Sequence, residues 1–208
     1  MSAMNANSAG EFVLQAQSSF SGLQSGAAAG GGVVASDGGS PALALVRARR
    51  GCVSELTRRV QGRFGIDLPA GPQRAEGSGV AFMGIAVETW LATAPAAERA
   101  TFTASLRGAL DEVAAVCDQS GAYAMLKLSG TRVREALAKF IAIDLHPEAF
   151  RPGAVGATVG GHIPLTLWRC NDAADALPVF ELAVPRSYSA SFWHMLTTSS
   201  AEFGFVLE

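Results

Sequence analysis

Residues 118–141 read DQSGAYAMLKLSGTRVREALAKFI, and this stretch decides the fold. The segment 121–128 is aromatic and aliphatic between two Ser-Gly pairs, which is typical of a β-strand. The segment 131–141 has helical periodicity instead. Its apolar face consists of Val133, Leu137, Phe140 and Ile141. The sequence therefore predicts a strand–turn–helix unit, and these residues by themselves indicate no chemistry.

The bulk composition fits one compact domain or one and a half. The chain has 208 residues, of which 49% are hydrophobic, enough to form a core without disulfides. Its net charge of −2 gives no electrostatic footprint for nucleic acid. Cys52, Cys117 and Cys170 are scattered and form no C-x-x-C pair, which favours reduced thiols in the cytoplasm. We recognise no secretory signal, and no apolar run reaches the ~18–20 residues of a membrane span.

Residues 1–40 differ in composition from the rest. Ser, Ala, Gly, Gln and Asn dominate, and charge is nearly absent. Such a segment buries too little apolar surface to offset the entropy of ordering it. We therefore predict a flexible N-terminal arm over 1–40 and a folded domain over 41–208. The alternative is an arm that orders against a partner through Phe12 and Phe20.

The folded part alternates strands and helices. Strands are predicted at 42–46, 79–86, 90–93, 113–117, 121–128, 155–159, 163–169, 179–184 and 203–207, and helices at 52–64, 95–110, 131–141 and 186–199. The order is β-α-β-β-α-β followed by β-α-β-β-β-α-β. This predicts an α+β fold of two split β-α-β (ferredoxin-like) halves, whose antiparallel or mixed sheets are covered by helices on one face.

Two adjacent glycines, Gly160 and Gly161, separate two alternating segments. They predict a tight hairpin turn with at least one residue at positive φ, because glycine adopts that conformation at little cost.

Motifs for cofactor binding and catalysis do not occur in this sequence. It contains no G-x-G-x-x-G after a strand, no Walker A sequence, no G-x-S-x-G and no H-E-x-x-H. Asp118 is interpreted as capping a turn with Ser120, and Asp144 as a loop residue. Three histidines lack ligand-like spacing: His146, His162 and His194. We therefore predict no catalytic, cofactor-binding or metal-ligating residue in this chain.

Two clusters combine aromatic residues with arginine. Trp168 and Arg169 end a predicted edge strand, whereas Arg186 and Tyr188 lead into a helix that carries Trp193. Aromatic residues and arginine are enriched at interface hot spots. We take these five residues as candidate subunit contacts, with the hydrophobic core as the alternative for the aromatic side chains.

A series of short segments resembles one protein family. In chain order the segments are Leu68-Pro69-Ala70-Gly71-Pro72, Trp90-Leu91, Asp118-Gln119-Ser120-Gly121, Leu128-Ser129-Gly130, Ile143-Asp144-Leu145-His146-Pro147, Phe150-Arg151-Pro152-Gly153, Thr158, Leu167-Trp168-Arg169 and Val184-Pro185-Arg186-Ser187-Tyr188. No single segment is specific, but their order and spacing over roughly 43–203 are similar to the gamma subunit of heterotetrameric sarcosine oxidase.

The resemblance implies a non-catalytic chain with an aminomethyltransferase-like, folate-binding fold. In this family's complexes the alpha and beta subunits hold NAD, FAD and covalently attached FMN, and a delta subunit binds zinc. The complex demethylates sarcosine oxidatively to glycine, forms hydrogen peroxide and passes the one-carbon unit to tetrahydrofolate. The resemblance therefore implies alpha, beta and delta partners and no cofactor in this chain. Two alternatives remain: a stand-alone folate-binding protein, and a subunit of a related amine or imino-acid oxidase.

Overall fold

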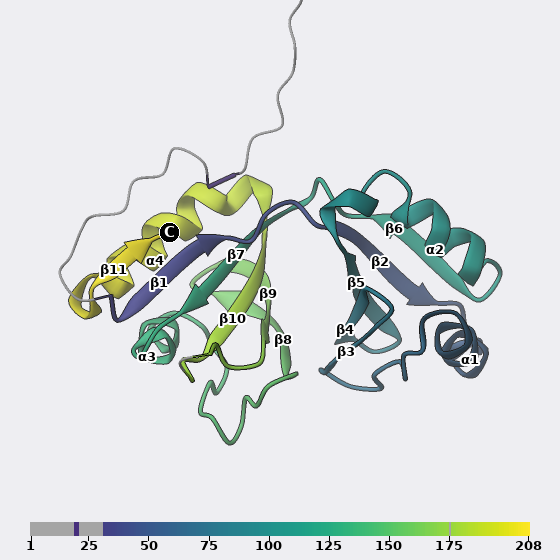
Figure 1. Ribbon diagram of the computed structural model, residues 1–208, viewed down its shortest axis with the longest axis horizontal. Helices are drawn as coiled ribbons and strands as arrows, with labels where there is room; N and C mark the ends of the chain where they lie inside the picture. The colour runs from purple at the N-terminus through teal and green to yellow at the C-terminus, as the bar shows by residue number, and fades with distance from the viewer. Residues whose placement is uncertain (1–18, 21–30, 175) are drawn as a thin grey trace, which may run out of the picture.

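The computed structural model describes residues 19–20, 31–174 and 176–208. Two β-sheets lie side by side, each with its own helices (Figure 1). The chain begins in one sheet at β1, passes into the other at β2, and returns at β7. The two halves are therefore connected by two separate crossings of the backbone.

The first half contains an antiparallel five-stranded sheet in the order β3-β4-β5-β2-β6. Its elements are β2 (Ala42–Ala48), α1 (Val53–Phe64), β3 (Arg74–Gly77), β4 (Val80–Ala86), β5 (Thr89–Ala94), a 3₁₀ turn (Ala96–Glu98), α2 (Phe102–Leu110) and β6 (Ala114–Asp118). Helix α1 buries Leu56, Val60 and Phe64 on one face and ends at Gly65, which adopts the left-handed conformation with φ 69°. This is the common glycine termination of a helix.

The second half contains a six-stranded sheet in the order β11-β1-β7-β10-β9-β8. Its elements are β1 (Val33–Asp37), β7 (Tyr123–Ser129), α3 (Val133–Ala138), β8 (Val155–Gly160), β9 (Ile163–Arg169), β10 (Val179–Pro185), a 3₁₀ turn (Arg186–Tyr188), α4 (Ser189–Ser200), a second 3₁₀ turn (Ala201–Phe203) and β11 (Phe205–Leu207). Strand β1 is parallel to β11 and antiparallel to β7, so the sheet is mixed.

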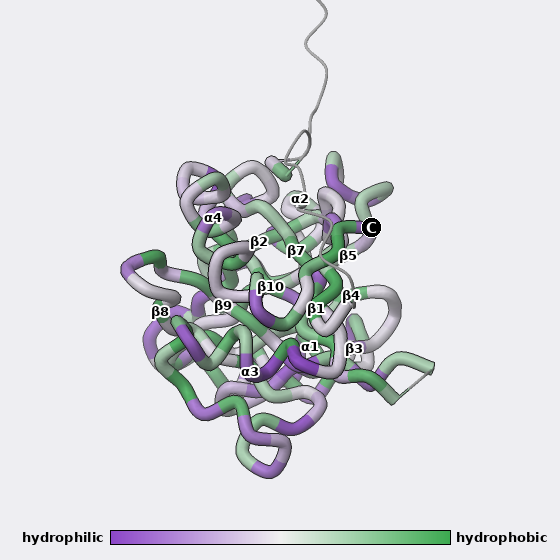
Figure 2. The backbone as a smooth tube through the Cα atoms, turned by 90° about the vertical axis from the view of Figure 1, so that its left-hand side faces the viewer, coloured by the Kyte–Doolittle hydropathy of each residue, from purple (hydrophilic) through white to green (hydrophobic). Residues whose placement is uncertain are grey.

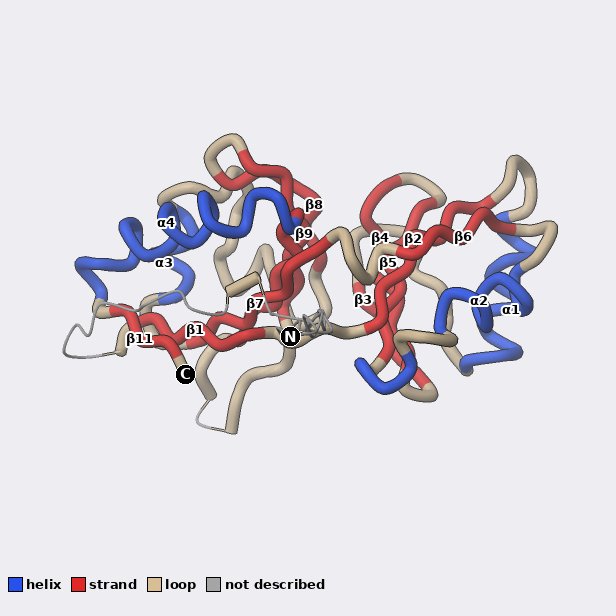
Figure 3. Tube along the Cα trace, turned by 90° about the horizontal axis from the view of Figure 1, so that it is seen from above, coloured by secondary structure: helices blue, strands red, loops and turns tan. Residues whose placement is uncertain are grey.

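The helices lie on the two far sides of the molecule and the sheets lie between them (Figure 3). Helices α1 and α2 pack on the first sheet, and α3 and α4 pack on the second, each pair over its own apolar core. A third cluster joins the two sheets. It consists of Leu43, Ala81, Met83 and Leu91 from the first sheet and Met125, Val155, Trp168 and Ala183 from the second. In Figure 2 the strands run largely in green through the middle of the molecule, and much of the purple lies in outer loops.

The predicted α+β class and its two split β-α-β halves are confirmed. Several elements differ from their predicted bounds, and the helix predicted at 186–199 begins only at Ser189, after a 3₁₀ turn. The helix predicted at 95–110 is a 3₁₀ turn followed by a shorter helix that begins at Phe102, and α3 is shorter than the predicted 131–141. Strand β3 was not predicted, because its sequence RAEG has no apolar alternation.

The predicted arm boundary at residue 40 is wrong for 33–37. These residues form β1, which lies inside the second sheet between β11 and β7. Val33 and Ala35 have no exposed surface, and Phe20 is only 4% exposed. Pairing with strands distant in sequence orders this short segment, and composition alone does not show such pairing. Phe12, the other proposed anchor, lies outside the described residues.

The predicted hairpin turn is confirmed, one residue later than its predicted position. Gly160 pairs with Ile163, which leaves Gly161 and His162 as the two loop residues. Gly161 has φ +61°, and a Cβ atom added there would meet the Met195 sulfur at 2.9 Å. Both the backbone conformation and the neighbouring side chain therefore favour glycine.

We expect Gly161→Val to lower the free energy of unfolding by about 1–2 kcal/mol, because an L-residue resists this conformation. Urea denaturation measures the change. Gly62→Val is the matched control, since Gly62 is in a helix and a Cβ atom there meets nothing within 4 Å. Equal stability of the Gly161→Val variant and the parent would contradict the turn.

We expect Phe20→Ala to cost about 3 kcal/mol of stability, as for other buried aromatic truncations. The ring packs against Trp193 with 5.7 Å between the ring centroids. Val87→Ala is the control because Val87 is 88% exposed. An unchanged denaturation midpoint for Phe20→Ala would show that residues before β1 contribute no packing.

Candidate subunit interface

The two backbone crossings meet at Ser120, between β6 and β7. Its side chain is buried, with 5% exposed. The hydroxyl oxygen accepts a hydrogen bond from the Leu43 amide at 2.9 Å and donates to the Leu43 carbonyl at 3.2 Å. The Gln119 amide also donates to that carbonyl, at 2.8 Å. Ser120 thus fastens the return crossing to the start of β2.

Asp118 stabilises the same turn. Its Oδ1 accepts the Ser120 amide at 2.8 Å, which confirms the interpretation that Asp118 caps a turn with Ser120. This amide bond is the main reason that the pKa of Asp118 lies below its usual value; the Ser120 side chain and the charges of Arg99 and Arg107 act in the same direction. Arg99 also donates to the Ser120 carbonyl at 2.7 Å. The acid at this position therefore has a structural role.

Three of the five candidate contacts are buried inside the chain, contrary to the prediction of a surface role. Trp168 is 2% exposed, Arg169 3% and Trp193 5%. Trp168 belongs to the cluster between the sheets and donates its indole N–H to Glu181 at 2.8 Å. Trp193 packs edge-on against Phe205, with 5.4 Å between ring centroids. The same residue types fill cores and interfaces, so their identity did not separate the two.

The two terminal nitrogens of the Arg169 guanidinium both have partners within the chain. Arg169 donates to the Val179 carbonyl at 3.0 Å, forms an ion pair with Asp172 and stacks over the Phe180 ring at 5.3 Å. Burial, followed by the charge of Arg134, lowers the pKa of Arg169. Arg134 lies over the same ring at 5.1 Å. This arrangement connects Asp172 to the sheet and leaves little of Arg169 for a partner.

The other two candidates lie at the surface near the crossings. Arg186 is half-buried, and its Nε donates to the Gly121 carbonyl at 3.2 Å. Its amide donates to the Ala122 carbonyl at 2.8 Å. Tyr188 is 46% exposed. Of the five predicted contacts, these two are accessible to another chain.

Sequence reasoning missed the most exposed apolar positions. Val87, at the tip of the β4–β5 hairpin, is 88% exposed, and Val159 on β8 is 44% exposed. A groove of about 430 Å³ adjoins Val159 on the face of the second sheet that is turned towards the first. It is lined by Tyr123, Ala157, Thr158, Val159, Pro164, Leu165, Thr166 and Pro185. The only sequence signal was a valine between the strands predicted at 79–86 and 90–93, which is too common to indicate an interface.

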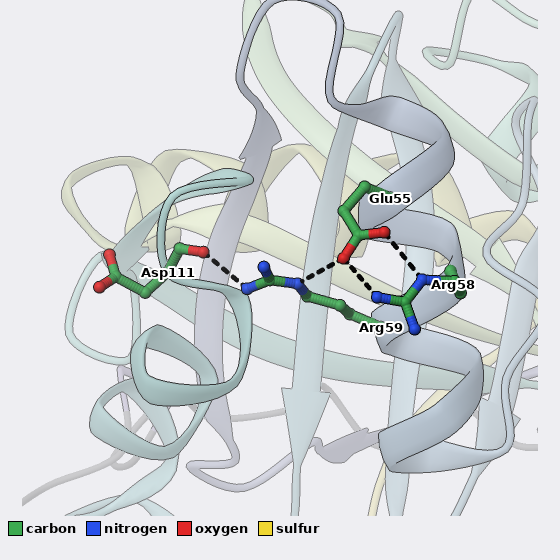
Figure 4. A network of polar contacts seen from close by, with 4 residues as sticks. All are labelled: Glu55, Arg58, Arg59 and Asp111. Atoms are coloured by element: carbon green, nitrogen blue, oxygen red, sulfur yellow. Dashed lines mark hydrogen bonds and ion pairs between the residues drawn. The ribbon is translucent and has the colours of Figure 1, made fainter.

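Charged side chains gather at the outer end of the first half. Glu55 accepts hydrogen bonds from Arg58 and from Arg59, whose Nη1 also donates to the Asp111 carbonyl at 2.8 Å (Figure 4). These bonds, that of Arg58 first, lower the pKa of Glu55 to about 2. The network connects α1 to the loop after α2 and uses the charges of both arginines locally.

Within 19–20, 31–174 and 176–208, no three His, Cys, Asp or Glu side chains are grouped to hold a metal ion. All three cysteines are free, and burial raises the pKa of the Cys170 thiol to about 11. That shift makes Cys170 a poor nucleophile at neutral pH. In the same ranges, no helix is both long and apolar enough to cross a membrane.

Comparison with solved structures first defines the class of fold. The chain is similar to the glycine cleavage system aminomethyltransferase T from Bartonella henselae, with a TM-score of 0.61 and 13% identity over 84% of this chain. The match covers only 47% of that enzyme. At this identity the similarity shows the fold alone, and it confirms the aminomethyltransferase-like architecture.

Two further comparisons define the family. A chain of the heterotetrameric sarcosine oxidase from Corynebacterium sp. U-96, solved in complex with pyrrole 2-carboxylate, has a TM-score of 0.72 and 26% identity, covering 85% of this chain and 88% of that one. Residues 53–202 match the sarcosine oxidase, gamma subunit family. A search of curated proteins gives no significant match. The chain therefore belongs to the sarcosine oxidase gamma subunit family, as the sequence resemblance indicated.

We expect Ser120→Ala to destabilise the chain by about 1–3 kcal/mol, because it leaves a buried backbone amide without its acceptor. Thermal and urea unfolding measure the loss. Ser187→Ala, at an exposed position, is the control and should leave stability nearly unchanged. If both variants unfold alike, Ser120 does not fasten the crossing.

Proposed function

We propose that this chain is the non-catalytic gamma subunit of a heterotetrameric sarcosine oxidase and acts in assembly. The observation that carries the proposal is the family match over residues 53–202, which spans elements of both sheets and all four helices. The similarity to a chain of a heterotetrameric oxidase over most of both chains supports the same role.

The complex would demethylate sarcosine oxidatively to glycine, with hydrogen peroxide formed and the one-carbon unit passed to tetrahydrofolate. Alpha, beta and delta subunits would supply NAD, FAD, covalent FMN and zinc. The surface hollows of this chain are consistent with cofactors that are held by the other subunits. The groove beside Val159 is lined by strand residues without an arginine or a helix N-terminus for a pyrophosphate. The hollow beside Arg49 and Arg107 has no aromatic ring to stack on a flavin.

The titratable groups with shifted pKa values support a structural role. Hydrogen bonds within the chain account for the lowered pKa values of Glu55 and Asp118. Burial accounts for the raised pKa of Cys170 and is the main cause of the lowered pKa of Arg169. Catalytic groups usually owe their shifts to a shared cleft. Arg169 and Cys170 are neighbours in the chain, but Glu55 is on α1 and Asp118 on β6, so the four groups belong to three separate places in the fold.

We expect the purified chain to be colourless near about 450 nm, where a flavin would absorb, and to consume no oxygen with sarcosine. Co-expressed with alpha, beta and delta subunits, it should purify with them in equal amounts. Omitting it should lower the yield or the thermal stability of the oxidase more than the flavin content per remaining complex. A chain that alone binds flavin and consumes oxygen would contradict the proposal.

A stand-alone folate-binding protein gives a different result in the same preparation. Titration of the isolated chain with tetrahydrofolate would then show saturable binding at micromolar concentrations or below. The proposed subunit should show none under those conditions. Replacing sarcosine with other secondary amines or imino acids in the oxygen assay of the whole complex distinguishes the related oxidases.

A further inference from the structure

The four edge strands of the two sheets differ in how much backbone they leave unpaired. Strand β8 is covered at both ends by its own chain: Val155 donates its amide to the Pro72 carbonyl, and the Val159 carbonyl accepts from Ala142. Strand β3 is covered near Gly77, where a Cβ atom would meet the Phe64 carbonyl oxygen at 2.7 Å. Strand β11 has only three residues. The remaining edge, β6, is five residues long.

The hydrogen-bond register fixes which backbone groups of β6 are free. The Arg49 amide donates to the Val113 carbonyl, and the Gln119 amide donates to the Leu43 carbonyl. In an antiparallel pair, alternate residues bond across the ladder. Residues 113, 115, 117 and 119 therefore face β2, and Ala114, Val116 and Asp118 turn their N–H and C=O groups away from the sheet.

Few contacts occupy these outward groups. Arg107 Nε donates to the Val116 carbonyl at 3.1 Å, and the Cys117 sulfur lies 3.7 Å from the Asp118 carbonyl. Within the described part of the chain, the amides of Ala114, Val116 and Asp118 have no acceptor. The sequence of β6, AAVCD, contains no proline or lysine of the kind that usually protects an edge.

Beside this edge lies a hollow of about 500 Å³. It is lined by Arg49, Arg107, Gly108, Asp111, Ala114, Ala115 and Val116. A neighbouring strand would pass about 4.8 Å from β6, so the hollow offers space where an added strand would begin. Strand β6 pairs with β2 along its whole length. A strand added at the outer edge of β6 would therefore extend the sheet into this space.

The charges around the hollow favour an acidic occupant. Arg58 and Arg59 share the single carboxylate of Glu55 (Figure 4). Arg49 and Arg107 form no ion pair among the described residues, although the charge of Arg107 acts on the Asp118 carboxylate. Both arginines line the hollow. Asp111 also lines it and its Oδ1 accepts the Glu112 amide at 3.0 Å; its charge offsets one of the two arginines, so the lining is positive by one charge.

We propose that the β6 edge and the hollow beside it receive an extended, acidic segment of a partner subunit, which adds a strand to the first sheet. Backbone groups of the segment pair with Ala114, Val116 and Asp118, and its carboxylates meet Arg49 and Arg107. Strand addition of this kind takes affinity from main-chain hydrogen bonds and specificity from flanking side chains. The proposal rests on the proposed function, since it requires a multisubunit complex.

Hydrogen exchange on the free chain and on the co-purified complex tests the proposal directly. In the free chain the outward amides of β6 should exchange fast, whereas Ala115 and Cys117, which pair with β2, are protected. In the complex, exchange at Val116 should slow on the order of tenfold or more, as expected when an amide gains a stable partner. Unchanged exchange at Val116 in an intact complex would overturn the proposal while leaving the subunit role in place.

Substitutions test the same edge by affinity. Val116→Pro removes an outward N–H without breaking the ladder, and it should weaken association roughly tenfold, the effect of one lost hydrogen bond. Val116→Ala, which shortens the same side chain but keeps the N–H, is the matched control. Arg49→Glu should weaken association, whereas Arg63→Glu, with the same charge change on α1, should not. Circular dichroism and melting curves confirm that each variant is folded.

Three results would overturn the proposal. The first is equal affinity of Val116→Pro and Val116→Ala variants for the partner subunits. The second is concentration-dependent dimerisation of the free chain, by analytical ultracentrifugation, with protection of the β6 amides, because the occupant would then be a second copy. The third is failure of the parent chain to associate with any oxidase subunit, which would overturn the proposed function as well.

Discussion

The bond between Ser120 and Leu43 is the interaction on which the two-sheet arrangement depends. Ser120 lies where the chain returns from the first sheet to the second, and Leu43 lies just after the chain has first crossed. Leu43 also belongs to the apolar cluster between the sheets. This residue pair therefore connects the two backbone crossings to the apolar cluster between the sheets, which we call the seam. Because both halves contribute strands to that seam, neither half keeps its inner face covered without the other.

The seam also determines which surfaces remain for partners. Trp168 is used in it, and Arg169 and Trp193 are used beneath the second sheet. Three of the five aromatic and arginine side chains that were predicted as interface contacts are thus buried in the fold. Besides Arg186 and Tyr188, the accessible features include the hairpin tip at Val87, the groove beside Val159 and the edge of β6. The assembly role proposed above depends on surfaces of this kind more than on a deep pocket.

Much of the fold could be predicted from the sequence because its strongest signals are local. The period of α1 and its glycine stop, the paired glycines of the β8–β9 hairpin and the Asp118–Ser120 turn each depend on residues close in sequence. Strand β1 could not be predicted, because its partners β7 and β11 lie far along the chain. The prediction that Trp168 contacts another subunit was wrong for a related reason. Its burial depends on which face of β9 meets the other sheet, and one sequence does not specify that face. The free edge of β6 follows only from the register.

Calorimetric unfolding of the isolated chain tests most directly whether the two backbone crossings and the seam couple the two halves into one cooperative unfolding unit. Chains of this length often unfold in more than one step. The account predicts a single transition with a ratio of calorimetric to van't Hoff enthalpy of about 1, and the same midpoint from probes of either sheet. Two resolved transitions, one for each half, would contradict it, because the Ser120–Leu43 bond and the cluster between the sheets would then not couple the halves.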